Sequence, residues 1–156
     1  MEVLEMVVAG VVATALLDVW QRVLRVTTGI PPSNWALVGR WFAHAARGRL
    51  FHKAIADAPP VANELAIGWA GHYAVGVVYG VAYVLLVRRV LGVEPSLVNG
   101  LVFGALSVVV PWFFFMPAMG AGVLGARTPN PRRACILAFA AHTIFGLGLA
   151  VGAMLV

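Results

Sequence analysis

Ionisable side chains interrupt the long apolar runs of this 156-residue chain, at positions where they could do chemistry. Asp18 and Glu64 carry carboxylates that bind cations, and His72 and His142 carry imidazoles that exchange protons near neutral pH. A charged side chain at the centre of a bilayer costs about 2.5–3.5 kcal/mol on insertion scales, so such residues usually serve a function. The set predicts an intramembrane site that binds a small cation or relays protons.

The same residues share a four-residue spacing with small residues. The series are Gly10, Thr14, Asp18 and Arg22; Glu64, Gly68, His72, Gly76 and Gly80; and Ala138, His142, Gly146 and Ala150. Residues four apart lie on one helix face, and small residues there let membrane helices approach closely. We expect the ionisable groups to face the bundle and to converge between the midplane and the inner leaflet. The glycines expected to pack helices are Gly10, Gly68, Gly76, Gly100, Gly104 and Gly146.

A second chemistry is open to His72 and His142, which could bind a transition metal or provide both axial ligands of a b-type haem. Glycines four residues away would leave room for a flat macrocycle, and Arg22 or Arg40 could hold its propionates. The structural alternative is two buried histidines, each hydrogen-bonded to a carbonyl or to Asp18. The sequence leaves these alternatives open.

The carboxylates also have structural alternatives. Asp18 and Arg22, four residues apart, could form an intrahelical ion pair, or Asp18 could bind a cation or pass protons. We expect Glu64, near a helix end, to pair with Arg40 or another loop cation. Arg22 and Arg40 are therefore predicted to supply supporting positive charge.

The composition indicates that these residues lie in a lipid environment. Hydrophobic residues make up 62% of the chain and charged residues 11%, and the mean hydropathy is +0.92. Soluble domains carry about 25% charged residues, so this chain has too little charge to coat a water-facing surface. A disordered chain, a nucleic-acid-binding domain and an ordinary soluble enzyme are excluded. No short catalytic motif is present, which disfavours an enzyme without excluding one.

Four helices must position the site, since lipid-exposed backbone has to satisfy its hydrogen bonds internally. The sequence predicts one all-α transmembrane domain over residues 1–156, a four-helix bundle with spans at about 3–26, 61–87, 97–117 and 134–156. Pro31 and Pro32 end the first span, and Ser33 or Asn34 can cap a new helix. We expect a short amphipathic helix at about 34–47, lying in the membrane interface.

The placement of positive charge predicts the orientation. Of the eleven Lys and Arg residues, all but Arg88 and Arg89 lie between the first and second or the third and fourth spans, or at their edges. The positive-inside rule puts those two loops in the cytoplasm and both termini outside. We expect anionic lipid headgroups to contact this side, including the face formed by Arg40, His44 and Arg47. Dimerisation through Gly100 and Gly104 is left open.

Several short motifs carry a family resemblance that covers nearly the whole chain. They are Gly10…Ala13-Thr14…Asp18-Val19-Trp20, Gly39-Arg40-Trp41, Glu64…Gly68-Trp69…His72-Tyr73…Gly76, Pro111…Met116-Pro117…Gly120…Gly122, Thr128-Pro129 and His142…Gly146. With these motifs the chain resembles a family of small, about four-span bacterial inner-membrane proteins catalogued only as a domain of unknown function. The resemblance implies a bacterial inner-membrane protein and supplies no catalytic residues.

Three functional hypotheses follow. The first is a binder or carrier in which Asp18, His72, His142 and Glu64 hold a small cation or relay protons. The second is a haem b protein with His72 and His142 as axial ligands. The third is a structural or assembly protein whose polar residues only fasten helices together.

Overall fold

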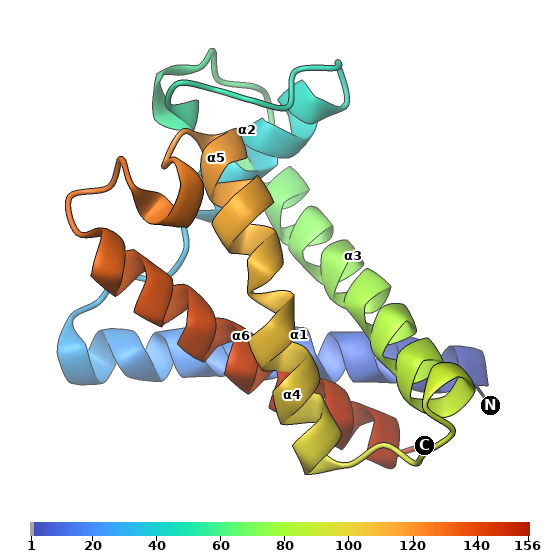
Figure 1. Ribbon diagram of the computed structural model, residues 1–156. Coiled ribbons are helices and arrows are strands. Elements are labelled where there is room, and N and C mark those ends of the chain that lie inside the picture. The colour runs from blue at the N-terminus through green and yellow to red at the C-terminus, as the bar shows by residue number, and fades with distance from the viewer. Residues whose placement is uncertain (1) are drawn as a thin grey trace. The chain divides into compact units, whose positions relative to one another are not determined.

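The computed structural model describes residues 2–156, and every regular element in that range is a helix (Figure 1). Four stretches are long and apolar enough to cross a membrane: Glu2–Thr28, Glu64–Val90, Leu97–Met119 and Pro131–Met154. The expected all-α fold with four membrane-spanning helices is confirmed. The elements are α1 (Glu2–Thr28), α2 (Trp35–Ala45), η1 (Ile55–Asp57), α3 (Glu64–Val84), η2 (Leu85–Val90), α4 (Leu97–Ser107), η3 (Pro111–Phe115), α5 (Met116–Met119), η4 (Val123–Gly125) and α6 (Pro131–Met154).

Local chemistry explains where the helices begin. The side chain of Asn34 accepts hydrogen bonds from the backbone N–H groups of Ala36 and Leu37, which caps α2 as expected. Asn130 accepts from the N–H of Arg133, and Pro131 occupies the first helical position, where it has no N–H to satisfy. The fourth span therefore begins three residues earlier than the apolar run indicates.

Two prolines alter the third span without ending it. Pro111 opens the π-helical turn η3, and Pro117 lies within α5, which continues to Met119. A π-helical turn accommodates the missing proline N–H because it changes the hydrogen-bond register locally. A second π-helical turn, η2, carries Arg88 and Arg89 at the end of the second span.

The chain divides into two compact units, and the first comprises residues 2–33, 72–106 and 141–156. In this unit glycines bring helix backbones together. A methyl group on Gly10 of α1 would overlap Gly76 and Val77 of α3, and one on Gly148 of α6 would overlap Ala13 of α1. A methyl group on Gly104 of α4 would likewise overlap Gly146 of α6. Backbone approach of this kind is how helices associate when lipid removes the usual hydrophobic drive.

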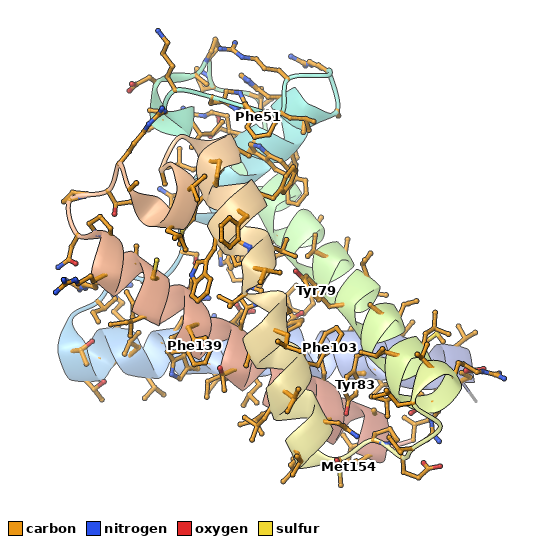
Figure 2. The ribbon with its side chains drawn as sticks, in the orientation of Figure 1. Phe51, Tyr79, Tyr83, Phe103, Phe139 and Met154 are labelled. Carbon is orange, nitrogen blue, oxygen red and sulfur yellow. The ribbon has the colours of Figure 1, made fainter. Side chains whose placement is uncertain are left out.

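Aromatic side chains pack between α3 and α4 of this unit. Figure 2 shows Tyr79, Tyr83 and Phe103 between these two helices, with the ring of Phe103 edge-on to both tyrosines. Tyr83 is fully buried, and its hydroxyl donates to the side chain of Asn99. The apolar core of the unit therefore contains a satisfied polar contact, which fixes α3 against the start of α4.

Ion pairs join the N-terminal end of α1 to η2. Arg88 donates through Nε to both carboxylate oxygens of Glu5, at 2.9 and 3.0 Å, and through Nη1 to Glu94 at 2.6 Å. Arg89 pairs with Glu2 at 2.7 Å. The Glu5 side chain is only 7% exposed, whereas Arg89 is 68% exposed, so the two pairs should differ in strength.

Replacing Glu5 with glutamine is therefore expected to destabilise the protein more than replacing Glu2. Glu5→Gln leaves Arg88 with one charged partner and should lower the melting temperature in detergent by about 3–6 °C. Glu2→Gln removes an exposed pair and should lower it by about 1 °C or less. Thermal unfolding of the two variants side by side tests this, and equal shifts would contradict the assigned difference in burial.

The second unit comprises residues 34–71 and 107–140. Its core is formed by Trp41, Ile55, Ala58 and Ala118, with the indole Nε1 of Trp41 donating to the carbonyl of Leu50. Helices α2 and α3 touch at Gly39 and Gly68, where a methyl group on either glycine would overlap the opposite backbone. The loop after α2 packs on Trp41 of α2, a helix that is itself in backbone contact with α3.

Candidate functional site

The polar cluster inside the membrane-spanning helices is formed by Asp18 of α1 with His72 and Tyr73 of α3. The Nε2 atom of His72 lies 3.0 Å from Asp18 Oδ1, and the Tyr73 hydroxyl donates to Oδ2 at 3.1 Å. The side chains of Asp18 and His72 are 12% and 9% exposed. The structure thus joins two of the residues expected to bind a ligand or proton, and adds Tyr73.

Helix packing explains why these residues meet. Thr14 Oγ1 donates to the carbonyl of Gly10, and a methyl group on Gly76 would overlap Thr14. Asp18 follows Thr14 by one turn, and His72 precedes Gly76 by one turn. Because α1 and α3 touch at Gly10, Thr14 and Gly76 with their chains running in opposite directions, the next turn of each places Asp18 against His72.

The geometry of the cluster defines its protonation chemistry. A carboxylate only accepts hydrogen bonds, so a charged Asp18 accepts one hydrogen bond from His72 Nε2 and one from the Tyr73 hydroxyl. In the low dielectric of a membrane bundle these two donors stabilise the carboxylate far more than they would in water. The carboxylate–imidazole pair can share or release one proton with little movement of heavy atoms.

The alternative ion pair between Asp18 and Arg22 is not formed in the described chain, where Asp18 is hydrogen-bonded to His72 and Tyr73. The role of Arg22 as a supporting charge stays a prediction.

His142 lies on α6 in the same unit, beside aromatic rings. Its ring is edge-on to Tyr79 with centroids 6.1 Å apart and tilted against Phe145 at 6.4 Å. The hydrogen bonds that Asp18 accepts come from His72 and Tyr73 and not from His142. His72 also directs Nε2, a nitrogen with which histidine binds metals and haem iron, at Asp18. In residues 2–156 no group of three or more His, Cys, Asp or Glu side chains could hold a metal ion.

Glu64 belongs to the second unit and pairs with Arg40, as expected from the sequence. Arg40 donates through Nε and Nη2 to the two carboxylate oxygens at 2.9 and 3.1 Å. Its Nη1 donates to the carbonyls of Ala56 at 2.8 Å and Ala58 at 3.0 Å. Glu64 also accepts from the N–H of Val61. This bidentate pair joins α2 to the start of α3 and holds the loop between them.

The expectation that the Arg40–His44–Arg47 face contacts lipid headgroups is wrong for Arg40 and His44. The Arg40 side chain is 14% exposed and His44 is buried, whereas Arg47 is exposed. The four-residue spacing correctly indicates a shared face of α2. That face is covered by residues 50–59 of the following loop, which the helical pattern does not describe.

The second unit contains a histidine pair that the sequence does not predict. His44 Nδ1 lies 3.1 Å from His52 Nε2, and His44 Nε2 lies 3.0 Å from the carbonyl oxygen of Pro59. Both side chains are buried. His52 lies in an irregular loop eight residues after His44, so no periodic spacing links the two. The only available signal was the presence of two histidines near one short helix.

These features define the class of the molecule as a multi-pass membrane protein with polar sites between its helices. Within that class, the chain belongs to the family DUF2938, described as a protein of unknown function, whose model matches residues 7–156. The expected membership of a family of unknown function is confirmed. No curated protein and no solved structure matches the chain.

Proposed function

We propose that this membrane protein binds and conducts protons at the Asp18–His72–Tyr73 cluster. The observation that carries the proposal is a carboxylate inside a membrane-spanning helix, 12% exposed, that accepts hydrogen bonds from an imidazole and a phenol of a second helix. Intramembrane carboxylate and histidine groups of this kind serve as proton relays in pumps and transporters. The site therefore has the donor and acceptor groups that proton exchange requires.

The roles within the cluster follow from its contacts. Asp18 is the proton acceptor, His72 exchanges the proton with it at 3.0 Å, and Tyr73 holds the second carboxylate oxygen. His142 is a candidate next member of the relay, since it lies in the same unit. Glu64 is assigned a structural role, because Arg40 and Val61 occupy its carboxylate.

We also propose that the protein lies in a bacterial inner membrane with the loops of the second unit in the cytoplasm. These loops, together with the first turn of α6, carry six exposed cations and one exposed carboxylate, Asp57, which fits contact with anionic headgroups. The cations are Arg47, Arg49, Lys53, Arg127, Arg132 and Arg133.

Replacing Asp18 with asparagine tests the function. The purified protein is reconstituted into liposomes that contain a pH-sensitive dye, and proton entry is driven by a valinomycin-clamped potassium gradient. We expect the wild type to acidify the lumen and Asp18→Asn to reduce the rate by at least about tenfold, because an amide cannot take up the proton. Asparagine still accepts one hydrogen bond through its carbonyl, so the fold should persist.

The matched control is Asp57→Asn, which removes an exposed carboxylate outside the spans and should conduct like the wild type. Equal flux in Asp18→Asn and the wild type would exclude conduction through this carboxylate. An absorption spectrum of the same preparation tests the haem b hypothesis, since a Soret band lost in both His72→Ala and His142→Ala would replace proton conduction with electron transfer.

A further inference from the structure

The His44–His52 pair of the second unit has a fixed arrangement of protons. The Pro59 carbonyl can only accept, so His44 Nε2 must carry a hydrogen and donate to it at 3.0 Å. In a neutral His44 the Nδ1 atom then bears a lone pair, and His52 Nε2 must donate to it at 3.1 Å. The hydrogen-bond network thus assigns one tautomer to each ring.

This assignment leaves a lone pair on His52 Nδ1. The His52 side chain is 6% exposed, and within residues 2–156 no hydrogen-bond partner reaches Nδ1. The nearby carbonyl oxygen of Ala118 accepts the backbone N–H of His52 at 3.0 Å. Nδ1 is therefore the one nitrogen of the pair at which an added proton displaces no existing hydrogen bond.

The surrounding charges oppose a cation at this position. Arg49 of the same loop acts on His52 directly, whereas Lys53 and Asp57 of the same segment are exposed to water. Helix α3 contributes Glu64, whose carboxylate is paired with Arg40, and α5 contains no ionisable residue. A doubly protonated His52 would thus be buried beside the positive charge of Arg49, near an Ala118 carbonyl that already accepts the His52 backbone N–H.

We propose that the His44–His52 pair is a proton-binding site whose occupancy releases the segment 49–59 from α2 and α5. The added proton goes to His52 Nδ1, and the resulting imidazolium leaves its buried position for water. Its departure breaks the bonds from His52 Nε2 to His44 and from the His52 N–H to Ala118. The pair lies outside the spans, so it responds to the aqueous phase, and the proposal does not depend on proton conduction at Asp18.

The direction of the pH response follows from the pKa of His52. Burial lowers this pKa below its ordinary value of 6.5, the charge of Arg49 lowers it further, and the Ala118 carbonyl opposes them. A lowered pKa in the closed form means that the open form binds protons more tightly. The closed segment is therefore fully stabilised above about pH 6.5 and loses stability as the pH falls below it.

Hydrogen exchange read by mass spectrometry tests this proposal on the full-length protein in nanodiscs. Labelling times are scaled for the intrinsic exchange rate at about pH 7.5 and about pH 5, which bracket the ordinary histidine pKa. In the wild type we expect the protection of peptides covering 49–59 to fall by about tenfold at the lower pH. His52→Gln, which can still donate to His44 Nδ1 but cannot be protonated, should keep its protection at both. The matched control His72→Gln should retain the pH-dependent loss.

Nitrogen-15 NMR of the four histidines supplies a second measurement that does not depend on a variant being folded. The signal of His52 should show an unprotonated Nδ1 at about pH 7.5, and its protonation should coincide with the loss of protection in 49–59. Protonation of His52 without any change in protection would overturn the proposal. So would a pH-dependent loss that persists in a folded His52→Gln protein.

Discussion

Replacing Arg40 with methionine should lower the melting temperature of the protein in detergent by about 10 °C, the largest effect expected of any single charge. The guanidinium of Arg40 makes two hydrogen bonds to Glu64 and donates to three loop carbonyls, those of Ile55, Ala56 and Ala58. Methionine fills much of the same volume but donates nothing. The variant therefore leaves a half-buried carboxylate and three carbonyls without their shared donor.

Two comparisons separate the loss of this pair from the loss of any arginine. Arg47→Met removes an exposed cation just after α2 and should change the melting temperature by about 1 °C or less. The double variant Arg40→Met with Glu64→Met removes the orphaned carboxylate as well, so it should recover part of the loss. If Arg40→Met and Arg47→Met have the same melting temperature, Arg40 does not hold the loop.

The sequence predicts the membrane fold well because lipid imposes one strong rule. Backbone groups in a bilayer must be satisfied within a helix, so apolar runs of sufficient length can be assigned to helices without knowledge of their neighbours. The four-residue series in α1 and α3 also predict part of the site. The stripe on each helix contains both a packing glycine, Gly10 or Gly76, and one member of the pair Asp18–His72. Tyr73 was missed because it follows His72 directly and lies outside the series.

The second unit was harder to predict for a physical reason. Periodicity states which residues share a face of a helix, but it does not state what covers that face. Arg40 and His44 share a polar face of α2, and such a face serves equally well against headgroups or against protein carbonyls. The covering segment, residues 50–59, is mostly irregular and carries no repeating pattern, so its hydrogen bonds to Arg40 and His44 appear only in three dimensions.

Valine at position 10 should destabilise the protein by about 3 kcal/mol or more, because it forces two helix backbones apart. A Cβ atom built on Gly10 would lie 2.5 Å from the carbonyl oxygen of Gly76 and from the Cα atom of Val77. Those atoms belong to the backbone of α3 and cannot rotate away as a side chain can. Unfolding in a graded series of sodium dodecyl sulfate concentrations measures the loss.

The matched control for Gly10→Val is Ala15→Val, which adds bulk to the exposed face of the same helix. It should change stability by less than about 0.5 kcal/mol, and a similar loss in both variants would show that Gly10 makes no close contact.

The substitution Gly10→Val also links helix packing to the proposed function. Asp18 meets His72 two turns beyond Gly10, so separating α1 from α3 should reduce proton flux in any Gly10→Val protein that remains folded. Full flux in a folded Gly10→Val protein would mean that conduction does not require the α1–α3 contact, and would count against Asp18 and His72 as its route.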